Sequence, residues 1–127
     1  MIVIDSSAMV AGLMNDGAAR EALASEQLHG PHLLDAEVAS AIRGRVVGGR
    51  LDAGAGWQLV STASRLAIAR YPSYPLVERI WELRPNLSAY DATYVALAEA
   101  LDCHLLTADM RIAGAPGLRC PLILVPD

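Results

Sequence analysis

Two residue types are missing from this chain of 127 residues: it contains no lysine and no phenylalanine. The absence of lysine excludes Schiff-base chemistry, a lysine general base and the phosphate-binding lysine of a P-loop. Without phenylalanine, the core has to be built mainly from Leu, Ile, Val and Ala, and such a composition favours helices. With 54% hydrophobic and 19% charged residues, the sequence predicts one packed domain over residues 1–127.

Long apolar runs and cysteines are also scarce. No run reaches the roughly 18 apolar residues that span a membrane, and the N-terminus lacks the basic and apolar regions of a signal peptide. The only cysteines are Cys103, placed in a predicted strand, and Cys120, placed just before another. Two cysteines without a secretion signal are typical of reduced thiols. We therefore expect a cytoplasmic protein that does not act at a membrane.

Positive charge is in short supply as well. The net charge is −4, and all 10 basic residues are arginine. Proteins that bind nucleic acid by charge alone are usually basic. A nucleic-acid role for this chain would therefore require local positive features or a bound metal ion.

Short apolar runs alternate with helical patterns along the chain. Runs without polar alternation predict buried strands at Met1–Ile4, Leu66–Ala69, His104–Leu106 and Leu122–Val125. Apolar spacing and capping residues predict helices at Ala8–Met14, Ala18–Leu28, Leu34–Val47, Asp52–Arg65, Pro75–Leu83 and Ser88–Leu101. Gly30-Pro31 should close the second helix, and Gly54 and Gly56 should delay the fourth. The alternation predicts an α/β fold, a three-layer α/β/α domain with a mostly parallel central sheet.

Four acidic residues stand where this fold would bring side chains together: Asp5, Glu37, Asp91 and Asp109. Asp5 and Asp109 each follow a predicted strand, so both belong at the carboxyl edge of the sheet, where parallel sheets bind ligands. Glu37 and Asp91 lie near the starts of their helices and would face the same pocket if those helices begin at that edge. Crowded carboxylates raise each other's pKa unless a hard cation such as Mg²⁺ or Mn²⁺ neutralises them.

Each of these acids also has a purely structural explanation. Asp5 suits a helix cap, and Glu37 suits the positive end of a helix dipole. Asp91 fits a capping pattern that begins at Ser88, and Asp109 suits a turn. The residue types alone leave both explanations open, and the surrounding motifs have to decide between them.

The motifs resemble those of PIN-domain ribonucleases, and within them the VapC toxins of VapBC toxin–antitoxin modules. The matching segments are Ile2–Ala8 (IVIDSSA), Leu34–Val38 (LDAEV), Leu87–Ala98 (LSAYDATYVALA) and Leu105–Asp109 (LLTAD). Their order and spacing fit over essentially the whole chain. The first and third segments are the most specific, and the segment around Glu37 is the weakest.

The resemblance implies an endoribonuclease that depends on Mg²⁺ or Mn²⁺ and hydrolyses RNA with a metal-activated water. Its products would be a 5′-phosphate and a 3′-hydroxyl. The catalytic acids would be the four above: Asp5, Asp91 and Asp109 would hold the metal, and Glu37 would orient the water. The resemblance also implies a homodimer and a small VapB-type antitoxin that blocks the pocket.

Other polar residues receive less definite assignments. The resemblance places Ser6 and Thr107 among the small hydroxyl residues that line such sites and bind substrate. Arg111 would either bind an RNA phosphate or pair with an acid. The cluster of Arg43, Arg45 and Arg50 suits a solvated helix end better than an RNA contact.

The remaining aromatic residues and histidines are predicted to be structural. Trp57 and Trp81 are expected to pack in the core or at an interface rather than stack on bases. His104 lies in a predicted buried strand, which favours a core histidine whose hydrogen bonds are satisfied. None of the three histidines shows ligand spacing, so a histidine general base has little support.

Two other functions fit parts of the pattern. A signalling receiver domain has a similar fold and an acidic Mg²⁺ pocket, but it needs paired acids after the first strand and a late lysine. Here Asp5 is followed by Ser6, and lysine is absent. The alternative that stays closer is a catalytically weak or inert protein of the same fold, acting mainly as an antitoxin-binding partner.

Overall fold

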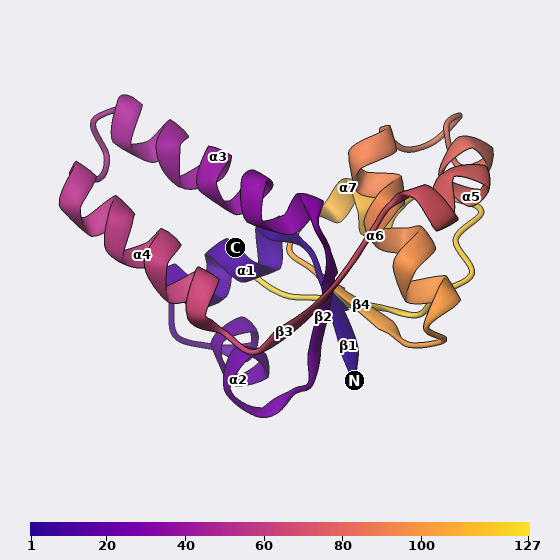
Figure 1. Cartoon of the computed structure of the whole chain (residues 1–127), viewed down its shortest axis with the longest axis horizontal. Coiled ribbons are helices and arrows are strands. Elements are labelled where there is room, and N and C mark those ends of the chain that lie inside the picture. Colours follow the sequence, from indigo (N-terminus) through magenta and orange to yellow (C-terminus); the bar gives the residue numbers. More distant parts are fainter.

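The computed structural model describes all 127 residues as alternating strands and helices (Figure 1). The strands are β1 (Ile2–Ile4), β2 (Leu28–Pro31), β3 (Ile68–Tyr71), β4 (His104–Thr107) and β5 (Leu122–Leu124). The helices are α1 (Ser6–Met14), α2 (Ala18–Ser25), α3 (Leu33–Val47), α4 (Ala53–Arg65), α5 (Val77–Glu82), α6 (Ala89–Ala100) and α7 (Met110–Ala113). A 3₁₀ turn, η1 (Tyr74–Leu76), leads into α5.

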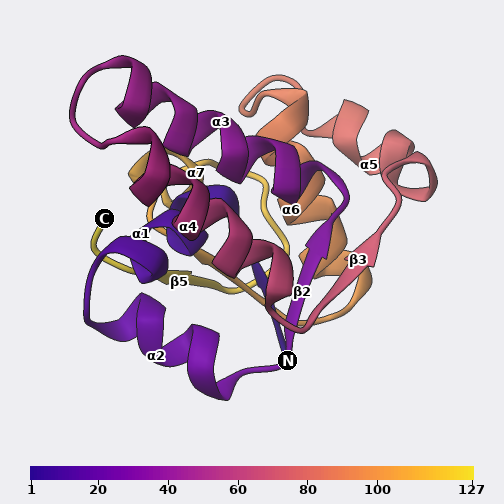
Figure 2. The same cartoon turned by 60° about the vertical axis from the view of Figure 1, so that its left-hand side comes forward.

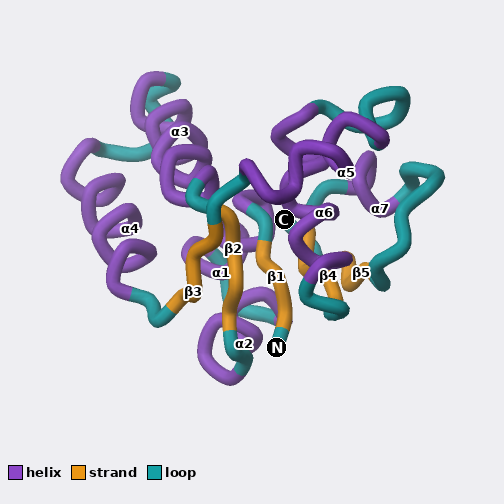
Figure 3. Tube along the Cα trace, turned by 45° about the vertical axis from the view of Figure 1, so that its right-hand side comes forward, coloured by secondary structure: helices purple, strands orange, loops and turns teal.

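The five strands form one sheet in the order β3-β2-β1-β4-β5, and every neighbouring pair is parallel. The strands run side by side through the middle of the molecule (Figure 3). Helices α1 to α4 lie on one side of the sheet and α5 and α6 on the other (Figures 1 and 2). The predicted three-layer α/β/α architecture is confirmed, with a sheet that is wholly parallel.

The core lies against both faces of the central strand. All three residues of β1 are buried, as expected for a strand that helices cover on both sides. Met9 of α1 and Tyr94 of α6 are among the largest fully buried side chains. They fill core space in a chain that has no phenylalanine. None of the helices combines the length and apolar character needed to cross a membrane.

The sequence analysis missed β2, which it assigned to the end of a helix closed by Gly30-Pro31. Helix α2 ends at Ser25, and Leu28–Pro31 pairs in register with Ile68–Tyr71. Pro31 is tolerated because it is the last residue of the strand, and the following amide of His32 donates to the Tyr71 carbonyl at 2.9 Å. The two residues that indicated a break therefore mark the end of a strand.

Other elements also differ from the prediction in their position or existence. Strand β3 lies two residues later than expected, α7 was not predicted, and Cys103 precedes β4 rather than lying in it. Helix α4 starts at Ala53 and continues through both glycines. A Cβ at Gly56 would lie 2.8 Å from Val46 Cγ2, so this glycine permits the close approach of α4 to α3 rather than weakening the helix.

Three side chains expected to be buried are exposed. His104 lies at the amino end of β4 and is exposed, so the prediction of a core histidine is wrong. Trp57 and Trp81 are 67% and 66% exposed, which excludes packing in the core. The guanidinium of Arg84 lies 4.6 Å from the ring centroid of Trp81.

Candidate active site

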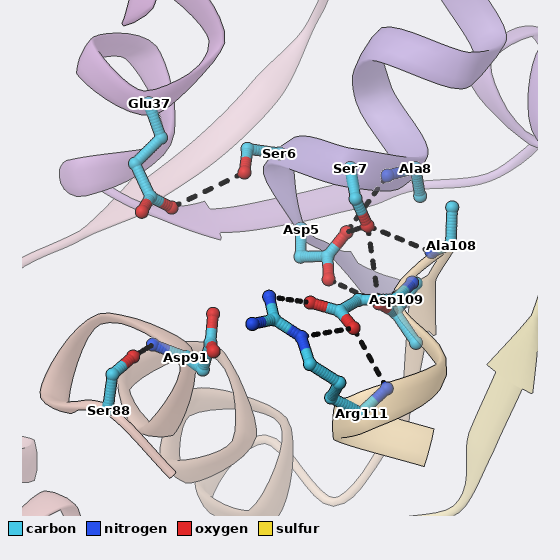
Figure 4. A network of polar contacts seen from close by, with 11 residues as sticks. Asp5, Ser6, Ser7, Ala8, Glu37, Ser88, Asp91, Ala108, Asp109 and Arg111 are labelled. Carbon is cyan, nitrogen blue, oxygen red and sulfur yellow. Dashed lines mark hydrogen bonds and ion pairs between the residues drawn. The ribbon is translucent and has the colours of Figure 1, made fainter. Parts of the chain in front are cut away.

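The carboxyl edge of the sheet brings the predicted acids to one place (Figure 4). Asp5 directly follows β1, and Asp109 lies two residues beyond β4, the strand next to β1. The chain reverses its order across the sheet between these two strands, which is the usual ligand site of such folds. Asp91 comes from the first turn of α6, and Glu37 from α3.

Asp5 is both a helix cap and the most buried acid of the site. Asp5 as a whole residue is only 3% exposed. Oδ1 accepts hydrogen bonds from the Ala8 amide at 2.9 Å and the Ser7 hydroxyl at 2.6 Å. Burial raises the pKa of Asp5 despite these bonds, and the charge of Asp91 raises it further. Asp5 can therefore cap α1 and also be an acid of the site.

Thr107 and Ser7 fix the orientation of this carboxylate. The Thr107 hydroxyl donates to Asp5 Oδ2 and accepts from the Asp109 amide at 3.0 Å. Ser7 Oγ accepts from the Ala108 amide at 2.9 Å. Thr107 has no exposed surface in this structure, and its contact with substrate stays a prediction. Its position ties the end of β1 to the end of β4.

Asp109 is held by its neighbour Arg111. The guanidinium donates to both carboxylate oxygens, through Nε at 3.2 Å and Nη2 at 2.8 Å (Figure 4). The Arg111 amide also donates to Oδ1 at 2.8 Å, which makes Asp109 the cap of α7. These contacts with Arg111 lower the pKa of Asp109. Of the two roles considered for Arg111, this structure shows pairing with an acid.

Asp91 is half-buried on the other side of the site. The Ser88 hydroxyl accepts from the Asp91 amide at 3.1 Å, so the predicted capping of α6 is confirmed. Its carboxylate forms no ion pair in the structure. Burial and the charge of Asp109 raise the pKa of Asp91. This carboxylate therefore lacks a close counter-ion of its own.

Glu37 is anchored through a single oxygen. Its Oε1 accepts from the Tyr94 hydroxyl at 2.6 Å and, in a longer contact of 3.4 Å, from the Ser6 hydroxyl. Tyr94 is only 1% exposed. Ser6 therefore contacts one of the predicted catalytic acids, and its contact with substrate stays a prediction.

Sequence reasoning missed Ser7 and Tyr94. Both lie inside the matching motifs, Ser7 in Ile2–Ala8 and Tyr94 in Leu87–Ala98, but neither was given a role of its own. Because Asp91 and Tyr94 are three residues apart on one helix, they lie on the same face. That spacing was the available signal that Tyr94 belongs near the acids.

The side chains of the site include the oxygen donors that a divalent cation needs. No three side chains among Asp, Glu, His and Cys are close enough together to enclose an ion as they stand. The chemistry nevertheless fits Mg²⁺, because this ion is commonly held by one or two carboxylates, with water and substrate phosphate completing the shell. Asp5 and Asp91 supply two such carboxylates, and Asp109 would join them after releasing Arg111.

Two cavities are lined by residues of the site. One cavity of about 770 Å³ is lined by residues that include Ser7, Asp109 and Arg111. A second of about 260 Å³ lies between α1 and α3, with Ser6 and Arg45 in its wall. Arg43 and Arg50 are exposed near the end of α3, which agrees with a solvated helix end. Arg45 is the one member of that cluster that shares a cavity with a site residue.

Comparison with known proteins agrees with this geometry. The family model of the PIN domain matches residues 2–118. This chain belongs to the PIN-domain family. Ribonuclease VapC9 of Mycobacterium tuberculosis is 54% identical over 126 residues, covering 99% of both chains. The resemblance drawn from the motifs is therefore confirmed, and within the family the chain groups with the VapC ribonucleases.

Solved structures share the fold at lower sequence identity. The crystal structure of PAE2754 from Pyrobaculum aerophilum has a TM-score of 0.76 and 22% identity, over 95% of this chain and 81% of that one. A toxin–antitoxin complex from Klebsiella pneumoniae has a TM-score of 0.65 and 16% identity, over 97% and 96% of the two chains. At these identities the likeness supports the PIN fold alone.

Proposed function

We propose that this PIN-domain protein is an endoribonuclease that depends on Mg²⁺ or Mn²⁺ and serves as the toxin of a VapBC-type toxin–antitoxin module. The observation that carries the proposal is the convergence of Asp5, Asp91 and Asp109 at the carboxyl edge of the sheet, beside the open cavity at Asp109. The ribonuclease names of its full-length relatives give the same reaction class. The cytoplasm stays its predicted location.

In this proposal Asp5 and Asp91 hold the ion, and Asp109 completes the site. When bound, the ion would neutralise the acids, polarise the scissile phosphate and lower the pKa of a water molecule. Ser7 and Thr107 keep Asp5 aimed at the site through their hydroxyl groups. Glu37 would accept a hydrogen bond from the attacking water and orient it for in-line attack. Hydrolysis would leave a 5′-phosphate and a 3′-hydroxyl.

A bound cation would also explain how an acidic chain binds RNA. The net charge of −4 repels a polyanion at long range, so affinity has to come from local contacts. The ion itself would be one such contact, and Arg45 and Arg111, which line the two cavities, are placed to supply others.

The expected partners belong to the same proposal. A VapB-type antitoxin would block the acidic pocket, and a second copy of the chain would form a homodimer. Exposed apolar side chains are available for such contacts. Tyr74, Val77 and Trp81 follow each other at helical spacing along η1 and α5 and are 80%, 58% and 66% exposed. Packing of Trp81 at an interface therefore stays a prediction.

The decisive experiment replaces Asp5 with asparagine. Asn keeps the capping oxygen that accepts from Ala8 but removes the charge, so the fold should persist. Cleavage of total RNA should fall by about 100-fold or more, in line with the loss of an essential charged group. EDTA should abolish cleavage by the wild type. Gel analysis of RNA with mapping of the cleaved ends measures both effects.

Asp52→Asn is the matched control. Asp52 caps α4 by accepting from the Ala55 amide at 2.9 Å and lies away from the site, so this variant should cleave RNA at the wild-type rate. Wild-type activity in Asp5→Asn, or cleavage that persists in EDTA, would overturn the proposed mechanism. A wild type that cleaves no RNA but binds an antitoxin would favour the inert alternative.

A further inference from the structure

We propose that Tyr94 is a positioning residue for RNA hydrolysis, which holds Glu37 through Oε1 so that Oε2 can orient the attacking water. The inference rests on the proposed function, because it assumes that Glu37 acts on water. It adds a fifth side chain to the four acids, from the face of α6 that also carries Asp91.

The first step of the argument is the bond itself. The distance from the Tyr94 hydroxyl to Glu37 Oε1 is 2.6 Å, and the only other donor to Glu37 is Ser6 at 3.4 Å. Hydrogen bonds to an ionised group are short and strong, whereas a contact of 3.4 Å between hydroxyl and carboxylate is weak. Tyr94 is therefore the main restraint on the Glu37 carboxylate.

The second step is that the Tyr94 hydroxyl is the donor in its bond to the Glu37 carboxylate and that the ring cannot easily move. Burial, and then its bond to Glu37, raise the pKa of Tyr94 far above its ordinary value, so the phenol stays protonated. The ring is fully buried among core residues. The hydroxyl is thus fixed by packing before substrate arrives, which is what a group that orients another side chain needs.

The third step concerns the oxygen that remains. Glu37 is half-buried, and its Oε2 accepts no hydrogen bond from the protein. In Figure 4 the carboxylate points from α3 toward the space between Ser6 and Asp91. One oxygen is therefore held by the protein, while the other, on the side away from Ser6 in Figure 4, accepts no hydrogen bond from it. This division suits a carboxylate that positions water.

The fourth step is the shared helix. Asp91 and Tyr94 are three residues apart in α6, so the spacing between the metal-binding acid and the anchor of Glu37 is fixed by one rigid element. Helix α3 supplies Glu37 independently. The hydroxyl of Tyr94 consequently links α3 to α6 at the site.

The test measures steady-state RNA cleavage with Mn²⁺ for wild type, Tyr94→Phe, Glu37→Gln and the double variant. Tyr94→Phe should lower kcat by about 10- to 100-fold, because misplacing a catalytic group by about 1 Å can cost about 100-fold. KM and the calorimetric Mn²⁺ affinity should stay within about twofold of the wild type, since the Tyr94 hydroxyl takes part neither in RNA binding nor in metal binding in this proposal. In the double variant, kcat should equal that of Glu37→Gln, because both changes remove one function.

Tyr90→Phe is the matched control. Tyr90 lies one turn earlier in the same helix and is 62% exposed, so loss of its hydroxyl should leave kcat unchanged. A readout without catalysis is the infrared band of the Glu37 carboxylate in protein labelled with ¹³C-glutamate. That band should shift in Tyr94→Phe and not in Tyr90→Phe.

Wild-type kcat in Tyr94→Phe, or losses that multiply in the double variant, would overturn the positioning role while Glu37→Gln still tests the proposed function. Wild-type kcat in Glu37→Gln would overturn the role of Glu37 and with it that of Tyr94. If Tyr94→Phe does not fold, the tyrosine C–O band of the wild type still decides. It should shift on Glu37→Gln, and an unchanged band would overturn the hydrogen bond on which the inference depends.

Discussion

Arg111 supplies the positive charge that pairs with Asp109 in this structure. Its side chain is 86% exposed, yet it pairs with both oxygens of Asp109. Its positive charge also acts on Asp91, whose pKa it lowers against the larger effects of burial and Asp109. An exposed arginine can leave at little cost. Arg111 therefore occupies Asp109 in this structure, and under the proposed function it would release Asp109 to a divalent ion.

Replacing Arg111 should strengthen metal binding. Arg111→Gln keeps the amide that caps α7 but removes the cation that competes for Asp109. We expect Mn²⁺ affinity to rise by about two- to fivefold, the range that follows from the strength of exposed ion pairs. Isothermal calorimetry on the protein without RNA measures this. Arg84→Gln, which removes an exposed arginine stacked on Trp81, is the control, and weaker Mn²⁺ binding in Arg111→Gln would contradict competition.

At the scale of residues, the sequence predicted the acids better than the groups that hold them. Asp5 was identifiable because a strand end and a motif coincide there. Its capping role and its place in the site turned out to be compatible, so the two explanations were never exclusive. Thr107 was predicted to contact substrate but is buried beneath Asp5. Thr107 reaches Asp5 only because β4 pairs with β1. A local sequence pattern does not reveal which strands pair.

Helices α5 and α6 are joined to the segment before β5 by one ion-pair cluster. Arg79 of α5 donates to Glu99 of α6 through Nε at 2.7 Å and to the Gly117 carbonyl at 2.8 Å. The Arg119 amide donates to Glu99 at 2.8 Å. Burial raises the pKa of Glu99, but the bonds from Arg79 and Arg119 outweigh it and leave the pKa lowered.

Removing the charge of Glu99 should therefore destabilise the fold in a way that depends on pH. Because folding lowers the pKa of Glu99, its contribution is present above the ordinary value of 4.5 and is lost as pH falls through the folded value. We expect Glu99→Gln to cost about 2 kcal/mol near pH 7, less than a fully buried pair because the cluster is partly exposed. Urea unfolding at several pH values measures the difference, which should shrink toward pH 3.

Glu82→Gln is the control for this cluster. Glu82 accepts a single bond from Arg79 at 3.1 Å, and its side chain is 46% exposed, so the loss should be below about 0.5 kcal/mol. Equal losses in the two variants would contradict a special role of Glu99. A loss that grows as pH falls would contradict the sign of its pKa shift.

At the scale of elements, the sequence predicted what is periodic and missed what is short. The long helix ending at Ala100 was predicted almost to its ends because Ser88 caps it and its apolar stripe is regular. Strand β2 was missed because four residues carry little pattern and two of them are glycine and proline. Its identity as a strand comes from pairing with β1 and β3, and neither partner is near it in sequence.

The sheet order explains why the acids meet at all. With β1 and β4 adjacent, residues more than a hundred positions apart, such as Asp5 and Asp109, follow neighbouring strands. The sequence predicted that edge from the parallel alternation. It could not predict that Asp109 would be paired with Arg111 or that Glu37 would be anchored by Tyr94, because both depend on side-chain packing.

The whole molecule bears a cost for gathering these carboxylates. Burial raises the pKa values of Asp5 and Asp91, and the charges of Asp91 and Asp109, respectively, raise them further. Because their folded pKa values are raised, these two acids contribute no penalty below the ordinary value of 3.8, and they increasingly destabilise the metal-free fold as pH rises through the folded values. A cation bound between the acids should offset this penalty.

Thermal unfolding with and without Mn²⁺ tests this balance. At a metal concentration about 100 times the dissociation constant, the wild type should gain about 2.7 kcal/mol. Asp5→Asn should melt above the wild type without metal, because the buried charge is gone, and should gain little from Mn²⁺. Asp52→Asn, which keeps the acid cluster, should gain as much as the wild type. An Asp5→Asn variant that melts below the wild type at pH 7 without metal would show that the acid cluster does not strain the fold. An equal gain in stability from Mn²⁺ would show that Asp5 does not bind the ion.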